Sequence, residues 1–142
     1  MKKVTALFAA LICILSFCGC SLPQALKTVK VDYGTSADYT REDMDKAIEI
    51  IKSEIEGWEG CKLNSISYTS DEEGRKELGR MNELEKANDN EQTFTQCIVF
   101  SSDFHTSKKD SEGFNSDYAY RDWKWFLARS DSGEWKLMTW GY

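Results

Sequence analysis

Apolar residues recur every three or four positions between residues 40 and 56, and this spacing predicts an amphipathic helix. Thr40 and Asp43 have the spacing of a capping-box start, and we expect Gly57 to close the helix in a left-handed conformation. The apolar stripe consists of Met44, Ala47, Ile48, Ile51, Ile55 and Trp58. A helix with such a stripe must bury it against another element, so we expect a sheet beneath it.

Alternating apolar and polar positions predict the strands of that sheet. In the segment 61–69 the parity of the apolar positions changes near Asn64 and Ser65, which indicates a β-bulge. The other expected strands are 91–104, 118–129 and 134–141, with a weakly alternating first strand at 28–33.

The polar segment 70–92 leaves two structures open. Ser70 and Glu73 can cap a helix whose apolar positions are Leu78, Met81 and Leu84. Gly74 and Gly79 weaken that helix, so a helix and a mobile loop are equally compatible with the sequence.

The register of the last two strands decides which aromatic side chains share a face, because side chains alternate along a strand. We expect a three-residue loop that closes on Gly133 in the left-handed conformation. This register places Trp123, Trp125 and Leu127 with Trp135, Leu137 and Thr139, and it places Phe126 with Met138 and Trp140 on the opposite face. A four-residue loop would instead bring Trp140 next to Trp123.

These elements predict an α+β domain in which one long N-terminal helix packs on a curved antiparallel sheet of four to five strands. No internal repeat or second domain is expected. The predicted organisation is an export signal at 1–20, a spacer at 21–30 and a single domain at 31–142.

The first residues are typical of an export signal, with Lys2 and Lys3 followed by an apolar run over 4–17. As a helix that run is about 21 Å long, shorter than the roughly 30 Å hydrocarbon core, so a permanent transmembrane span is the weaker interpretation. The end of the run resembles a bacterial lipobox, with Gly19 before Cys20 and Phe17 where Leu is usual. The resemblance implies that Cys20 carries fatty acyl chains such as palmitate and holds the domain on the extracytoplasmic side of the cell membrane. An ordinary cleaved signal without lipid is the alternative.

The cysteine count then predicts a disulfide. Of five Cys, Cys13 and Cys18 are removed with the signal and Cys20 is used by the anchor. The remaining Cys61 and Cys97 are expected to pair, because an exported protein is in an oxidising environment. The alternatives are two buried free thiols, or a metal pair that lacks the further His or Cys ligands it needs.

Two segments carry a resemblance to known families. Residues 129–137 (RSDSGEWKL) resemble the closing hairpin of nuclear transport factor two-like domains. The wider pattern of Cys61, residues 97–100 (CIVF), 123–125 (WKW) and 140–142 (WGY) after a lipobox resembles small uncharacterised bacterial lipoproteins. The resemblance implies a nuclear transport factor two-like fold, with a cystatin-like arrangement as the alternative, and it implies no activity.

The net charge and the candidate catalytic residues argue against several functions and point to no specific activity. With 24 acidic and 18 basic residues the chain is acidic, which argues against a nucleic-acid partner. His105 is the only histidine and has no fixed catalytic partner in the sequence. We expect the carboxylates of Asp103, Asp117, Asp122 and Glu134 to be solvated at strand ends, and the oxygen-rich loop with Asp110, Glu112 and Asn115 to be solvated rather than bound to calcium. No metal or cofactor is expected.

Aromatic residues are the most suggestive feature, since they make up 13% of the chain and include five Trp. Most should be core, but exposed rings can stack on a sugar or hold a partner's side chain. The candidate binding residues are Tyr118, Tyr120, Phe126, Trp140 and Tyr142. We therefore expect a membrane-tethered, non-enzymatic domain that binds a small ligand or an envelope protein through the concave face of its sheet. The alternatives are a cell-wall or glycan hydrolase with a carboxylate pair and a structural accessory of an envelope complex.

Overall fold

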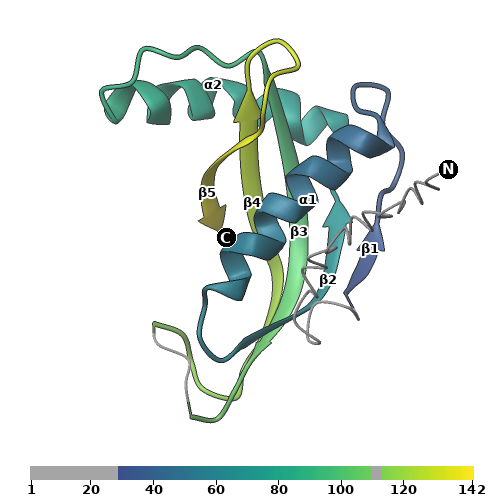
Figure 1. Ribbon diagram of the computed structural model, residues 1–142, viewed down its shortest axis with the longest axis vertical. Coiled ribbons are helices and arrows are strands. Elements are labelled where there is room, and N and C mark those ends of the chain that lie inside the picture. Colours follow the sequence, from purple (N-terminus) through teal and green to yellow (C-terminus); the bar gives the residue numbers. More distant parts are fainter. Residues whose placement is uncertain (1–28, 110–112) are drawn as a thin grey trace, which may run out of the picture.

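The computed structural model describes residues 29–109 and 113–142 (Figure 1). The predicted export signal, the predicted lipobox with Cys20 and the predicted spacer up to residue 28 lie outside the described residues, as do Asp110 and Glu112 of the oxygen-rich loop. Within the described ranges, neither helix combines the length and the apolar character that crossing a bilayer requires.

The chain forms an α+β fold built on one five-stranded sheet with the strand order β1-β2-β3-β4-β5. The strands are β1 (Lys30–Asp32), β2 (Cys61–Tyr68), β3 (Gln96–Thr106), β4 (Ala119–Arg129) and β5 (Lys136–Gly141). The four strands β2 to β5 are antiparallel neighbours, as predicted. The sheet as a whole is mixed, because β1 pairs parallel with β2. The helix between β1 and β2 carries the chain back across the sheet, and such a crossover makes its two flanking strands parallel.

Two helices of similar length pack on this sheet: the expected long N-terminal helix, and a second one in the segment for which the sequence left a helix and a loop open. The first, α1 (Arg41–Glu56), begins with the predicted capping box between Thr40 and Asp43 and buries the predicted positions from Met44 to Ile55. Its end differs from the prediction, because Gly57 keeps a right-handed conformation with φ −76°. The left-handed residue is Gly60, which turns the chain into β2 with φ 75°.

The second helix, α2 (Asp71–Ala87), settles the open question about the segment 70–92. Ser70 caps it by accepting a hydrogen bond from the backbone N–H of Glu73. Gly74, which lowers helix propensity, is needed for packing. A Cβ atom at this position would lie 2.2 Å from the carbonyl oxygen of Cys97, so only glycine lets α2 approach β3 this closely.

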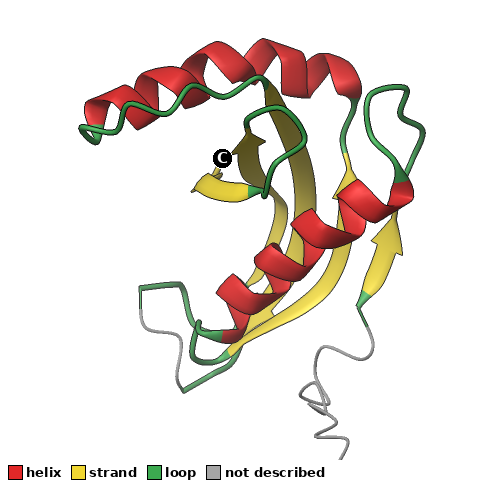
Figure 2. Ribbon diagram, turned by 45° about the horizontal axis from the view of Figure 1, so that its top comes forward, coloured by secondary structure: helices red, strands yellow, loops and turns green. Residues whose placement is uncertain are grey.

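The two helices cover opposite faces of the sheet (Figure 2). The face under α1, called the α1 face here, carries the larger core, with Ile48, Ile51, Ile66, Phe100, Phe104, Trp125 and Leu127 among its buried residues. The face under α2, called the α2 face, carries a smaller core of Met81, Phe94, Cys97, Val99, Phe126 and Ala128. The side of the sheet to which a strand residue points therefore decides whether it packs against α1 or against α2.

Three irregularities break the strict alternation of faces. The first lies in β2 between Leu63 and Ser65, where the parity change predicted a bulge. The second lies between β3 and β4, where Ser102 pairs with Trp123 but Phe104 pairs with Tyr120. At this bulge Asp122 adopts a positive φ of 55° and its N–H donates to the Asp103 carboxylate at 3.1 Å.

The third irregularity corrects the predicted register of the last hairpin. Leu127 pairs with Leu137, as the three-residue loop predicts, but Trp125 pairs with Trp140. Met138 is the extra residue of this bulge, and beyond it the faces of β5 are exchanged. Trp140 therefore lies on the α1 face, where the prediction had placed it on the opposite one.

The turn of this hairpin also differs from the prediction. Gly133 is not left-handed; the positive φ values belong to Asp131 (40°) and Ser132 (60°). The N–H of Gly133 donates to the carbonyl of Ser130 at 2.8 Å, which closes a tight turn with two left-handed central residues. Turns of this kind match the twist of paired strands.

Polar contacts fix the second helix at both ends. At its start, Asp71 accepts hydrogen bonds from the hydroxyls of Tyr68 (2.6 Å) and Ser36 and from the N–H of Ala37 (2.8 Å). Burial raises the pKa of this carboxyl, but the three hydrogen bonds outweigh it and hold the pKa at about 2. Near its end, the buried carboxylate of Glu85 accepts two hydrogen bonds of 2.8 Å from Lys136 at the start of β5.

The predicted disulfide between Cys61 and Cys97 is wrong, since both thiols are free. Cys61 lies opposite Thr106 at one end of β3, whereas Cys97 is near the other end, about 30 Å away at roughly 3.3 Å per residue. The two side chains also pack on opposite faces of the sheet. A disulfide needs its Cα atoms within about 7 Å, so the fold separates this pair completely.

The close approach of α2 to β3 at Gly74 can be tested with two glycine-to-alanine variants of α2. Gly74→Ala should lower the free energy of unfolding by about 1–3 kcal/mol, because the new methyl group overlaps the Cys97 carbonyl. Gly79→Ala in the same helix has open space around the added Cβ and should raise it by roughly 0.5–1 kcal/mol. Urea denaturation followed by circular dichroism measures both changes. Equal effects of the two substitutions would contradict this packing.

Candidate functional site

Nine aromatic side chains form one connected group at the end of the sheet where α1 finishes, and this group is called the aromatic cluster here. Its members are Trp58, Phe104, Phe114, Tyr118, Tyr120, Trp123, Trp125, Trp140 and Tyr142. They come from β3, β4, β5 and the residue that follows β5, from the segment after α1, and from the loop between β3 and β4. Each ring has another ring within about 5 to 6.5 Å of its centroid, the spacing at which aromatic pairs attract.

Trp58 is the centre of the cluster, although it lies outside the sheet. Its ring stacks on Trp125 with a centroid distance of 5.2 Å and also contacts Trp140 at 5.6 Å. Its indole N–H donates to the carboxylate of Glu54, one turn earlier, at 3.3 Å. The last turn of α1 therefore holds Trp58 over the sheet.

Three members of the cluster are exposed. Tyr118 is 49% exposed, Trp140 is 42% exposed and Tyr142 is 81% exposed. No other large apolar side chain in residues 29–109 and 113–142 is as exposed as these. These three rings, together with the partly exposed Trp58 and Trp123, are called the aromatic patch here. Trp58 contacts Trp140 and Trp123 contacts Tyr142, whereas Tyr118 joins the group through the buried Tyr120.

The second bulge places Tyr120 and Trp123 on the same face, although their numbers differ in parity. Tyr120 stacks on Phe104 at 4.8 Å, and Trp123 contacts Tyr120 at 5.7 Å and Tyr142 at 5.2 Å. The indole nitrogen of Trp123 is buried and has no hydrogen-bond partner in the part of the chain that the structure describes. A buried donor without a partner costs stability, so packing of the rings must hold this side chain in place.

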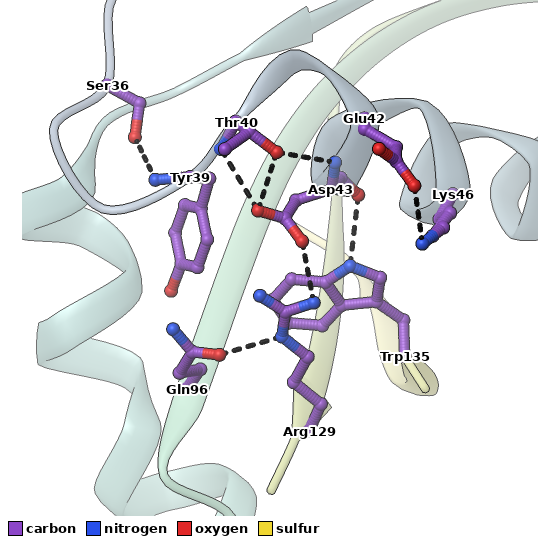
Figure 3. A network of polar contacts seen from close by, with 9 residues as sticks. All are labelled: Ser36, Tyr39, Thr40, Glu42, Asp43, Lys46, Gln96, Arg129 and Trp135. Atoms are coloured by element: carbon purple, nitrogen blue, oxygen red, sulfur yellow. Dashed lines mark hydrogen bonds and ion pairs between the residues drawn. The ribbon is translucent and has the colours of Figure 1, made fainter. Parts of the chain in front are cut away.

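A polar network joins α1 to the hairpin of β4 and β5 (Figure 3). Arg129, which is 4% exposed, donates from Nη1 to the Asp43 carboxylate at 2.8 Å and from Nε to Gln96 at 2.7 Å. Its guanidinium lies 4.2 Å from the centre of the Trp135 ring, and the indole N–H of Trp135 donates to the Asp43 carbonyl at 3.0 Å. The same aspartate thus caps α1 and binds the hairpin.

The electrostatics of Asp43 follow from these contacts. Burial raises the pKa of its carboxyl, but the hydrogen bonds from the Thr40 backbone and from Arg129 outweigh burial and lower the pKa below its usual range. Nearby, burial raises the pKa of Tyr39 to about 12, and its hydroxyl donates to the Cys97 carbonyl at 2.8 Å. Both groups are already paired, so the network is suited to holding elements together rather than to proton transfer.

An open pocket of about 390 Å³ lies beside this network, between α1 and the hairpin turn. Its lining includes two carboxylates, two cations and the apolar side chains of Ile50 and Trp135. The charged groups are Asp43, Lys46, Arg129 and Glu134. Arg129 and Asp43 bind each other and Lys46 binds Glu42 at 2.9 Å, so most of this charge is neutralised within the protein.

The structure brings together four of the five predicted binding residues. Tyr118, Tyr120, Trp140 and Tyr142 belong to the aromatic cluster, although Tyr120 is buried within it. Phe126 does not belong, because it lies buried on the α2 face with the guanidinium of Arg80 4.6 Å from its ring centre.

Sequence reasoning missed Trp58 and Trp123 as parts of the same surface. Trp58 belongs to the apolar stripe that the sequence predicts, and such a stripe is expected to be buried. Alternation correctly places Trp123 on the face of Trp125, but it does not bring Tyr120 to that face. The bulge at Asp122 does so, and its only sequence signal is an aspartate that tolerates a positive φ.

Most of the candidate catalytic residues in the described ranges contact neighbouring polar groups. The side chain of His105 is 44% exposed, and its Nε2 lies 3.4 Å from a carboxylate oxygen of Asp117. The other carboxylate oxygen of Asp117 lies 3.8 Å from the Lys108 ammonium. Asp103 and Asp122 meet at the β3–β4 bulge, where Asp122 is exposed and its backbone N–H occupies the Asp103 carboxylate. Glu134 lines the pocket beside the hairpin turn. Among the described residues, no three His, Cys, Asp or Glu side chains come close enough to hold a metal ion.

The two free thiols are poor nucleophiles. Burial raises the pKa of Cys61, and burial together with the charge of Glu77 raises the pKa of Cys97 to about 12. A thiol reacts as its thiolate, so the raised pKa values lower the reactivity of both groups.

The ion pair between Asp43 and Arg129 can be tested by a double-mutant cycle with Asp43→Asn and Arg129→Met. We expect a coupling of about 1–2 kcal/mol in urea unfolding at pH 7, because one carboxylate binds a buried cation. The folded-state pKa of Asp43 is lowered, so this stabilisation is present above the unfolded pKa of about 4 and decreases as the pH falls. The coupling should therefore be smaller at pH 3. An unchanged coupling at pH 3 would show that the carboxylate charge contributes nothing.

Comparison with known proteins gives no relative for this chain: no family model, no curated protein sequence and no solved structure matches it.

Proposed function

We propose that this protein is an exported, lipid-anchored module that binds a partner protein at the aromatic patch and carries out no catalysis of its own. One observation carries the binding role. The large apolar side chains that remain exposed in the described residues all belong to a single connected group of rings. Exposed aromatic rings that lie together are typical of recognition surfaces, since Trp and Tyr bury a large area at a low cost in conformational entropy.

The buried rings under the aromatic patch hold its exposed rings in position before a partner binds. Trp140 and Tyr142 rest on Trp58 and Trp123, which are themselves packed against the buried Phe104 and Trp125. Rings held in this way lose little freedom when a partner covers them, which favours affinity. The patch lies at the end of β5, a strand that is paired only with β4 in the described sheet.

The anchor is proposed from the lipobox at Gly19 and Cys20. Fatty acylation of Cys20 would attach the domain to the cell membrane on its extracytoplasmic side. From Cys20 to Val29, where the described domain begins, the chain can span at most about 30 Å. The patch would then meet partners at or near the membrane surface.

We propose that the fold is similar to those of nuclear transport factor two-like and cystatin-like domains. The support is a helix that precedes a four-strand antiparallel meander and packs across one of its faces. The helix α2, inserted between the first two strands of that meander, covers the other face.

Replacing the anchoring cysteine tests the location. Cys20→Ala should move the protein from the membrane fraction to the soluble extracytoplasmic fraction, because no acyl chains can be attached. Cys61→Ala is the matched control, since its half-buried thiol lies within the domain and it should leave the protein on the membrane. Fractionation followed by immunoblotting measures both. Membrane retention of Cys20→Ala would contradict the anchor.

A photo-crosslinking residue tests the binding surface. When p-benzoylphenylalanine replaces Tyr142 or Tyr118 in the producing cells, irradiation should give one discrete adduct with an envelope protein, identified by mass spectrometry. The same residue at the exposed position of Glu83 on α2 should not give it. Adducts of equal strength at all three positions, or at none, would contradict recognition at the patch.

A further inference from the structure

Three cation–π contacts within the described residues show how this protein uses its aromatic rings. The guanidinium of Arg41 lies 3.5 Å from the ring centre of Tyr33, that of Arg80 lies 4.6 Å from Phe126, and that of Arg129 lies 4.2 Å from Trp135. All three cations are arginines. Arginine suits this contact because its planar guanidinium can stack on a ring and is weakly hydrated.

The aromatic cluster is the exception to this pattern. Although it is the largest group of rings in the described residues, none of these guanidinium groups lies on it. Lys124, which stands between Trp123 and Trp125 in β4, points to the opposite face by alternation. The exposed ring faces of Trp140 and Tyr142 therefore have no arginine of the described chain stacked on them.

Charge around the patch favours a cation. The Glu54 carboxylate accepts a hydrogen bond from Trp58 at the inner edge of the patch. The exposed carboxylate of Asp122 lies close enough to Tyr142 to act on its phenol, although burial is the larger cause of the raised pKa of this group. The whole chain has a net charge of −6, which attracts basic partners at a distance.

We propose that the aromatic patch recognises arginine side chains of a basic partner polypeptide, whose guanidinium groups stack on Trp140 and Tyr142. This inference rests on the proposed partner-binding function and names the chemistry of the partner. The rings are exposed by 42% and 81%, so they present open faces rather than a closed cage. Open faces fit a planar guanidinium better than a tetrahedral ammonium, which is held best when rings surround it.

Peptide binding tests the proposal with the full chain purified in detergent micelles. The probes are two fluorescein-labelled peptides of equal length and charge, with the repeat Gly-Ser-Arg or Gly-Ser-Lys taken four times. Fluorescence anisotropy should show that the arginine peptide binds about fivefold more tightly than the lysine peptide. Added salt should weaken both, because each carries positive charge toward an acidic protein. Equal affinities for the two peptides would overturn the proposal.

Variants locate the binding on the protein. The double substitution Trp140→Ala with Tyr142→Ala should weaken the arginine peptide about tenfold, because two stacking faces are lost. Thr139→Ala is the matched control, since it lies in the same strand opposite Phe126 of the α2 face and should leave the affinity unchanged. Circular dichroism checks that both variants remain folded. A loss of equal size in the control would overturn the assignment to the patch.

The indole N–H resonances of the chain give a readout that needs no substitution. On addition of the arginine peptide, the resonances of Trp140 and Trp58 should shift, while that of Trp135 beside Arg129 should not. If the arginine peptide does not bind but Tyr142 still crosslinks to one envelope protein, the arginine inference fails and the binding function stands. If neither is observed, both fail.

Discussion

The aromatic surface depends on two β-bulges, one in the pairing of β4 with β3 and one in the pairing of β4 with β5. At Asp122 the pairing with β3 shifts, so that Tyr120 and Trp123 both face α1. At Met138 the pairing with β5 shifts, so that Trp140 faces Trp125. Strict alternation would have divided these aromatic residues between two faces. The two bulges instead collect them on one face, where Trp58 at the end of α1 covers part of the group and leaves the rest exposed.

Polar contacts bind both helices to the hairpin that carries this arrangement. Asp43 binds α1 to the hairpin through Arg129 and Trp135, and Glu85 binds α2 to the start of β5 through Lys136. Both helices are thus tied to the same hairpin that carries Trp140. The contacts of Asp43 and Glu85 lie at a distance from the exposed aromatic rings, which stay accessible to a partner. The proposed recognition of arginine uses the interaction that the protein already makes internally at Trp135.

Much of the fold could be predicted from local pattern, while the site could be predicted only in part. The three-four spacing gave α1 with its cap and buried face, and alternation gave the strands β2 to β5. Gly74 appeared as a weakness of α2 because propensity ignores packing against Cys97, and the disulfide failed because a cysteine count contains no distances. The face of Trp140 was wrong because alternation assumes unbroken pairing, and a single extra residue at Met138 reverses it.

Nuclear Overhauser contacts of the Trp140 ring test the central claim most directly, because the register beyond Met138 decides which neighbours it has. The structure predicts cross-peaks from the Trp140 ring to the rings of Trp58 and Trp125, at centroid distances of 5.6 and 6.1 Å. Cross-peaks from Trp140 to Phe126 and Met138, with none to Trp58, would show that β5 pairs without a bulge. In that case the exposed aromatic residues would not form one surface, and the account of recognition built on it would be wrong.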